Sequence, residues 1–221
     1  MGVLMTMTNA VVEYIINNWS QILSLTVEHI HITSIAMGLA ILVSVPLGIF
    51  ITRFSRLDSL VIGAVGVLQT IPSLALLAVM IPFLGVGFKP AVVALFLYAL
   101  LPIVRNTYLG VKEVTPVLVK AARGMGMTRF QILIKVQIPI ALPVIIGGIR
   151  TSTVICIGTA TIAALIGAGG LGSLIYRGLQ QFRTEYIITG ALFSALLAMS
   201  LDYGMGAIEY LITSKGLRHN Q

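Results

Sequence analysis

The sequence predicts an all-α membrane protein, with about five transmembrane helices preceded by an N-terminal interfacial helix. Three observations lead to this fold class. First, 57% of the 221 residues are hydrophobic and only 10% are charged, whereas about a quarter of the residues of a soluble domain are charged. Second, the apolar residues form long stretches that can cross a ~30 Å hydrocarbon layer as helices of about 20 residues. Third, most of the cations lie between these stretches.

Residues 1–32 are predicted to form an extracytoplasmic helix that lies along the membrane surface. Apolar residues recur at helical spacing from Val12 to Ile30, and polar residues such as Glu13 and Asn17 occupy positions between them. Such a helix buries its apolar face at the interface and leaves its polar face in water.

One membrane domain, residues 33–213, is predicted to follow, with a short cytoplasmic tail at 214–221. Its spans lie near residues 33–52, 58–84, 90–109, 140–166 and 186–212. The second stretch is interrupted by Pro72, but each half would have only about 13 residues, which is short for a span. We therefore expect one long helix that is kinked at Pro72.

The positions of the cations predict the orientation in the membrane. If the N-terminus lies outside, the turn after the first span, the loop at 111–139 and the tail all lie inside. These segments carry Arg53, Arg56, Lys112, Lys120, Arg123, Arg129, Lys135, Lys215 and Arg218, whereas the outer segments carry only Lys89, Arg177 and Arg183. The positive-inside rule therefore places the N-terminus outside and the C-terminus inside. Because the net charge of +7 is not gathered on an aromatic-laced patch, a nucleic-acid partner is not expected.

The loop at 111–139 is expected to contain two short helices, of which the first is apolar. Thr115 can cap this helix, Pro116 suits its first turn, and Gly124 and Gly126 suit its end. Its apolar residues, which have no span to serve, are Val117, Leu118, Val119, Ala121, Ala122 and Met125. An exposed apolar helix face of this kind usually meets a partner. The alternative is a solvated basic loop that faces anionic lipid.

The second short helix is predicted from a capping box. Thr128 is followed three residues later by Gln131, which is the spacing of this motif. Pro139 then either stops the helix or starts the next span. Together the two helices would form a helix-turn-helix elbow parallel to the membrane.

This loop resembles the EAA loop of type I ABC importer permeases. The pattern of that family is Glu-Ala-Ala, three residues, Gly, nine residues and then Ile-x-Leu-Pro. The residues at the matching places, with the spacing intact, are Ala121, Ala122, Gly126, Val136, Ile138 and Pro139. Lys120 departs from the pattern, because it stands where the family usually has glutamate.

The resemblance implies the type I ABC importer permease fold and a set of partners. A coupling helix would dock into a groove of a cytoplasmic ABC ATPase dimer; its residues here would be Val119, Lys120, Ala121, Ala122, Arg123, Gly124, Met125 and Gly126. ATP and Mg would bind to that ATPase, and no cofactor to this chain. A second permease, identical or homologous, and an extracytoplasmic substrate-binding protein would complete the importer in the membrane lipid of a bacterial cell.

Two further runs are similar to the permeases of osmoprotectant importers, which carry glycine betaine, choline or carnitine. They are QTIPSLALLAVMIPFLGVGFKPAVVALFLYALLPIVRNTY, from Gln69 to Tyr108, and GTATIAALIGAGGLG, from Gly158 to Gly172. The resemblance extends over residues 30–215. Methionine importers share the GAGGLG element, so an importer for another small solute, such as an amino acid, is the alternative.

Arg150 and Asp202 lie too deep in their spans to be loop charges. Each is about ten residues from the inner end of its span, which places both ~15 Å from the cytoplasmic face. Because an isolated charge near the bilayer centre costs roughly 3 kcal/mol, we expect the two to pair across the fourth and fifth spans. The pair either fixes the register of the helices or takes part in transport.

Two other features are candidates for the substrate path. The ring of Tyr98 suits a quaternary ammonium ion through cation–π attraction, although the resemblance places high-affinity recognition in the binding protein. The glycine run after the fourth span permits tight turns and would form a flexible outer gate, consisting of Gly167, Gly169, Gly170, Leu171 and Gly172. A plain turn between two helices is the alternative for this run.

Three classes of function remain open from the residues. The first is the membrane subunit of an ATP-driven importer, and the second is an ion-coupled secondary transporter or channel that uses Arg150 and Asp202. Paired repeats, which are usual in the second class, are not visible. The third is a structural membrane subunit. No enzyme activity is expected, because the sequence contains no P-loop and no credible nucleophile and base. His29 and His31 fall on different helix faces without further ligands, so no metal site is expected.

Overall fold

The computed structural model of the chain describes residues 2–54 and 56–212. Every regular element in this range is a helix, which confirms the predicted all-α fold. The elements are α1 (Gly2–Asn17), α2 (Trp19–Ile51), α3 (Leu57–Thr70), α4 (Ser73–Leu84), α5 (Phe88–Lys112), α6 (Pro116–Gly124), α7 (Arg129–Ile132), a π-helical turn (Leu133–Gln137), α8 (Ile138–Ala163), a 3-10 turn (Ala164–Ile166), α9 (Gly172–Gln181) and α10 (Thr184–Ile212).

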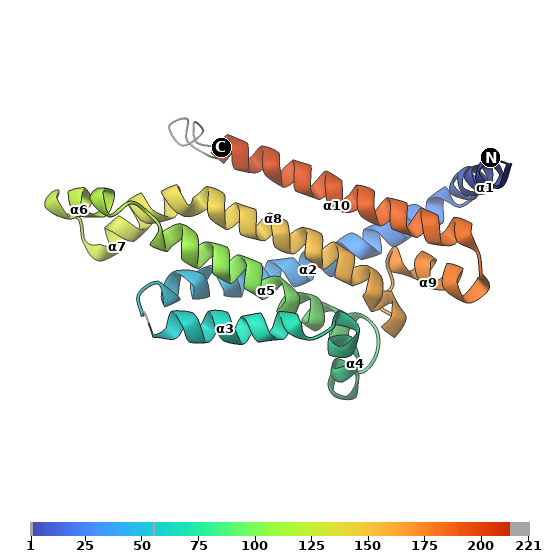
Figure 1. The fold of residues 1–221 in the computed structure, drawn as a ribbon, viewed down its shortest axis with the longest axis horizontal. Coiled ribbons are helices and arrows are strands. Elements are labelled where there is room, and N and C mark those ends of the chain that lie inside the picture. Colours follow the sequence, from blue (N-terminus) through green and yellow to red (C-terminus); the bar gives the residue numbers. More distant parts are fainter. Residues whose placement is uncertain (1, 55, 213–221) are drawn as a thin grey trace.

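The long helices run along one direction of the molecule (Figure 1). Four of them are long and apolar enough to cross a membrane, namely α2, α5, the helical stretch Arg129–Ile166 and α10. The helix α5 packs against both α2 and α8, and α10 packs against α8 and α9. The short helices α6 and α7 lie at one end of the molecule, and α1 and α9 lie at the other.

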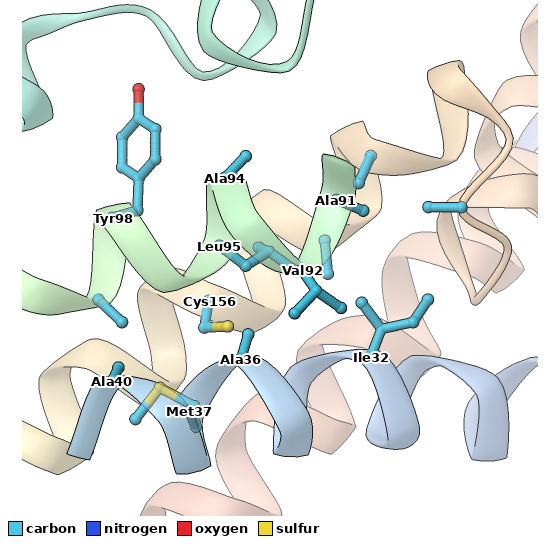
Figure 2. Close-up of a cluster of buried hydrophobic side chains, with 14 of the residues drawn as sticks. Ile32, Ala36, Met37, Ala40, Ala91, Val92, Ala94, Leu95, Tyr98 and Cys156 are labelled. Atoms are coloured by element: carbon cyan, nitrogen blue, oxygen red, sulfur yellow. The ribbon is translucent and has the colours of Figure 1, made fainter. Parts of the chain in front are cut away.

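Small side chains let the three central helices approach closely. Figure 2 shows this core, to which α2 contributes Ala36 and Ala40, α5 contributes Ala91 and Ala94, and α8 contributes the buried thiol of Cys156. Interfaces between membrane helices are rich in small residues because association there depends on close van der Waals contact. The central helices of this protein therefore follow the packing rule of membrane proteins.

The first long helix begins earlier than the sequence predicts. An interfacial helix reaching Ile30 and a separate span from about residue 33 are expected, but α2 is continuous over 33 residues and the break lies at Asn18. At 1.5 Å per residue α2 is ~50 Å long, so it is long enough to cross the hydrocarbon layer and extend beyond it. No glycine or proline interrupts the chain around residue 32, and nothing local ends the helix there. The membrane boundary near residue 32 stays a prediction.

The predicted kink at Pro72 is a break between two helices. The sequence favours one bent helix, but α3 and α4 meet at an angle of 95°. Ile71 and Pro72 both have extended backbone, with ψ angles of 126° and 136°. Proline disfavours helical torsion angles in the residue before it, and two extended residues turn the chain much further than a kink. The location of the bend was therefore predicted and its size was not.

The helix α5 satisfies the backbone groups that this break exposes. The Tyr98 hydroxyl donates a hydrogen bond to the carbonyl of Ile71, and Nε2 of Gln69 donates to the carbonyl of Tyr98 over 3.0 Å. Pro102, four residues after Tyr98, has no N–H to offer that carbonyl. In Figure 2 the Tyr98 ring points away from Cys156 and towards the α3–α4 segment. Tyr98 thus attaches the segment between α3 and α4 to α5 through two hydrogen bonds, one from its side chain and one to its backbone carbonyl.

Replacing Tyr98 with phenylalanine should destabilise the protein, although the ring remains. The change leaves the Ile71 carbonyl without its donor, which costs about 1 kcal/mol and corresponds to a melting temperature about 2–4 °C lower. Thermal unfolding in detergent measures this difference. Tyr203→Phe is the matched control, because that side chain is 71% exposed on α10. An unchanged melting temperature for Tyr98→Phe would contradict the anchoring role.

Candidate functional site

The short helix α6 presents an uncovered apolar face. It begins after Thr115 with Pro116 in its first turn, as predicted, although the Thr115 side chain forms no cap hydrogen bond. Its Ala122 is buried, whereas the side chains of Val117, Leu118 and Met125 are 69%, 45% and 70% exposed. The described part of the chain therefore leaves an apolar surface on α6 open to a partner.

The end of α6 turns on a glycine. Gly126 has a φ of +80°, which disfavours other residues, and the N–H of Met127 bonds the carbonyl of Ala122 over 3.1 Å. This arrangement satisfies the last carbonyls of the helix. The glycine at the seventh position of the EAA pattern thus has a backbone reason to be there.

The second half of the loop is joined to the membrane helix that follows. The capping box is present, because Oγ1 of Thr128 accepts from the Gln131 N–H and Oε1 of Gln131 accepts from the Thr128 N–H. The helix does not stop before Pro139, however. A π-helical turn shifts the Ile138 N–H to the carbonyl of Leu133, and α8 continues with Pro139 in its first turn. A proline needs such a local shift because it lacks an N–H and crowds the preceding turn.

An ion cluster joins α8 to α10. Arg150 donates from Nε and from one terminal nitrogen to the two carboxylate oxygens of Asp202, both over 3.0 Å, and from its other terminal nitrogen to Glu209 over 2.8 Å. Arg150 and Asp202, which the sequence predicts to pair, are therefore in contact. Glu209 was missed, although its spacing of seven residues from Asp202 places both carboxylates on one face of a helix.

The cluster borders an open hollow in the side of the molecule. Its side chains are 30%, 34% and 16% exposed for Arg150, Asp202 and Glu209. Arg150 and Asp202 line a hollow of about 500 Å³ together with Gly147, Thr151, Val154 and Ile155. A water-filled or partner-covered hollow is where charged groups at membrane depth are tolerated.

The same cluster holds the second half of α10 in place. The buried residues of α10 are Thr189, Gly190, Ser194 and Leu197, and none of the described residues after Leu197 is buried. Beyond that point Ala198 and Leu201 still pack against the apolar cluster that contains Ile157 of α8. Polar contacts join them, since Thr153 Oγ1 lies 3.6 Å from Met205 Sδ and the guanidinium group covers Gly206. Arg150 is therefore the ionic attachment of this half of α10 to α8 among the described residues.

The glycine run is a turn packed against α2. Gly167, Gly169 and Gly170 have φ angles of +80°, +85° and +74°. The N–H of Gly170 donates to Oε2 of Glu28 over 3.0 Å, and a Cβ atom at Gly170 would lie 3.0 Å from Nδ1 of His29. Sequence reasoning assigned no role to Glu28 or His29 in this turn, because no periodicity links two positions that are 142 residues apart.

Two members of the predicted gate are core residues of this structure. Leu171 is fully buried in an apolar cluster with Ile22 and Leu174, and Gly172 lies so close to the Thr161 carbonyl that a Cβ atom would be only 2.1 Å from it. His29 also belongs to this region, where its Nε2 bonds the carbonyl of Ile157 over 3.1 Å. Motion of the run would have to break the Glu28 bond and expose Leu171.

Tyr98, which the sequence suggests for the substrate path, does not border the hollow beside Arg150, and neither does Tyr108. Tyr98 is engaged at the break between α3 and α4. The Tyr108 hydroxyl donates to Asp58 and accepts from Lys112, and the Lys112 ammonium lies 4.5 Å above the centre of the Tyr108 ring.

The residues that the structure describes contain no group of three or more His, Cys, Asp or Glu side chains that could hold a metal ion. The tail with Lys215 and Arg218 lies outside the described residues.

Comparison with known proteins finds relatives over nearly the whole chain. A family model described as "Binding-protein-dependent transport system inner membrane component" matches residues 44–213. The chain is 47% identical to the carnitine transport permease protein OpuCB of Listeria monocytogenes, over 95% of this chain and 96% of the relative. It is also 47% identical to the glycine betaine/carnitine/choline transport system permease protein OpuCB of Bacillus subtilis (strain 168), over 95% and 97% of the two chains.

A solved structure shares the fold. A chain from the MetNI methionine ABC transporter in an inward-facing conformation superposes with a TM-score of 0.80 at 24% identity, over 87% of this chain and 96% of that chain.

Substitutions in the ion cluster should have unequal effects. Arg150→Ala leaves Asp202 and Glu209 without a shared cation, whereas Asp202→Ala leaves Arg150 bonded to Glu209. We expect a larger drop in melting temperature for Arg150→Ala, and the double variant should be less affected than the sum of the single ones. Thermal unfolding of the three variants in detergent measures this. Equal and additive losses would show that the pair has no energetic coupling.

Proposed function

This chain belongs to the family of binding-protein-dependent transport system inner membrane components, and we propose that it is the permease of an ATP-driven importer for quaternary-amine osmoprotectants. The substrate class is that of glycine betaine, choline and carnitine. The observation that carries this proposal is the 47% identity, over nearly the whole chain, to permeases named for these solutes. A methionine-type amino acid is a weaker candidate, because that likeness lies at 24% identity.

The importer would need three partners of this chain. A cytoplasmic ABC ATPase dimer would bind ATP and Mg and would dock on α6, whose exposed apolar residues support such a contact. A second permease, identical or homologous, would cover the open side of α8 and α10, where the hollow beside Arg150 lies. An extracytoplasmic binding protein would deliver the solute at the α1–α9 end of the molecule.

The proposed topology has the N-terminus outside and the C-terminus inside a bacterial cell membrane. Residues 1–32 would reach the outer face, residues 33–213 would form the permease domain, and 214–221 would be a cytoplasmic tail. The positive-inside rule supports this, because the α6–α7 end carries Lys112, Lys120, Arg123, Arg129 and Lys135. The coupling helix, from Val119 to Gly126, would then face the ATPase.

Motion would pass from the ATPase to the membrane helices in three steps. Closure of the ATPase pair would displace α6, whose linker leads directly to the capped start of α7. The stretch Arg129–Ile166 is helical throughout, so a displacement of α7 also moves α8. The Arg150 cluster would transfer that movement to the second half of α10. Arg150 and Asp202 would thereby act on the translocation path, with the glycine run as its outer gate.

The direct test is uptake by the reconstituted complex of this chain, its candidate ATPase, the partner permease and the binding protein. We expect labelled carnitine, choline or glycine betaine to accumulate in vesicles only when ATP is present, with methionine failing to compete. Accumulation that follows an ion gradient without ATP would reject the importer in favour of a secondary transporter. Competition by methionine alone would move the substrate class to amino acids.

A substitution in α6 tests the ATPase contact separately. Leu118→Asp places a charge in the proposed interface, where loss of a central contact costs about 2 kcal/mol or more and weakens binding of the ATPase ~30-fold or more, so uptake should fall. Leu118→Met keeps an apolar side chain of similar volume and should retain uptake. Co-purification with the ATPase should follow the same order. Normal uptake by Leu118→Asp would mean that α6 does not dock.

A further inference from the structure

Four cations surround one pocket at the α6–α7 end of the molecule. The pocket has a volume of about 190 Å³, and its lining includes Arg53, Lys112, Arg123 and Arg129, which come from the segment after α2 and from α5, α6 and α7. No carboxylate of the described residues lines it. Like charges confined to one pocket repel one another, and an anion between them removes that repulsion.

The three arginines have no carboxylate partner in the described part of the chain. Only Lys112 is paired, with Asp58 at 3.1 Å. A terminal nitrogen of Arg53 donates to the backbone carbonyl of Arg129 over 3.4 Å, which draws the end of α2 towards the start of α7 but neutralises no charge. Arginine is the residue that suits phosphate best, because its planar group offers parallel N–H donors to two oxygens.

The pocket lies where the long helices end. Thr52 directly follows α2, and Val111 and Lys112 form the last turn of α5. The ends of spans lie at the level of lipid head groups, where basic pockets between helices bind their phosphates. Val119 and Arg123 line the pocket from α6, whereas the exposed apolar side chains of Val117, Leu118 and Met125 do not. The pocket is thus separate from the apolar face of α6.

We propose that this pocket binds the phosphate group of an anionic phospholipid. Free inorganic phosphate offers the same chemistry, and the location at the ends of two spans favours the lipid. A phosphate held there would bridge the ends of α2 and α5 to α6 and α7, and would fix the loop relative to the membrane helices. The proposal does not depend on what is transported; only the leaflet follows from the proposed topology.

Native mass spectrometry of the full-length chain in detergent tests the site. The probes are phosphatidylglycerol, zwitterionic phosphatidylcholine and inorganic phosphate. We expect phosphatidylglycerol to remain bound in preference to phosphatidylcholine, and Arg53→Gln/Arg129→Gln to bind it at least ~10-fold more weakly, because each hydrogen bond to a charged group is worth about tenfold or more in affinity. Arg53→Lys/Arg129→Lys keeps the charge without the planar donors. Its affinity for phosphatidylglycerol should lie between those of the unmodified chain and the glutamine variant.

The matched control is Arg56→Gln/Lys135→Gln, which removes two cations of the same loops that do not line the pocket. It should bind phosphatidylglycerol as the unmodified chain does. Equal loss in the control and the pocket variant, or equal binding of the two lipids, would overturn the site. Binding of inorganic phosphate that phosphatidylglycerol cannot displace would overturn the lipid source. If the pocket variant binds phosphatidylglycerol as tightly as the unmodified chain does, the arginines do not hold the lipid phosphate and the proposal is overturned.

Discussion

Backbone polar groups at membrane depth need partners within the protein. The break between α3 and α4 leaves such groups without helical partners, and two bonds between Tyr98 and residues 69–71 satisfy them. Pro72 separates α3 from α4, and Pro102 leaves the Tyr98 carbonyl without its usual donor. Gln69 and the Tyr98 hydroxyl supply the missing bonds from opposite helices. Specific bonds also satisfy backbone groups near the ends of the spans, in the π-helical turn ahead of Pro139 and at the Gly170 N–H, which donates to the Glu28 carboxylate.

Much of the fold follows from local sequence signals. The apolar stretches predict the long helices because their length matches the hydrocarbon layer, and Thr128 with Gln131 predicts a helix start because both bonds are local. The size of the bend at Pro72 could not be predicted in this way. It depends on two extended residues and on Tyr98, which lies on another helix. The continuity of α2 through residue 32 also reflects packing, since Ile32 and Ala36 lie in the central core.

In the candidate site, too, sequence signals predict some residues, whereas others depend on partners that are distant in the sequence. Their matching depth in the spans is enough to predict that Arg150 and Asp202 pair, because a charge inside a membrane needs a partner. Glu209 was within reach of the same reasoning, since it follows Asp202 by two helical turns. Glu28, His29 and the burial of Leu171 were not, because their partners lie far away in the sequence and no pattern connects them. The proposed gate is therefore a turn held to α2, whose opening requires specific contacts to break.

In the proposed mechanism, a continuous route would lead from α6 to the membrane helices: α7 and α8 form a single helical stretch, and Arg150 would link it to α10. The most direct test is the ratio of imported solute to hydrolysed ATP in the reconstituted complex that carries Arg150→Ala. Because α6 remains intact, we expect ATP hydrolysis to continue while uptake falls, so that the ratio drops. An unchanged ratio would contradict the role of Arg150 as the link.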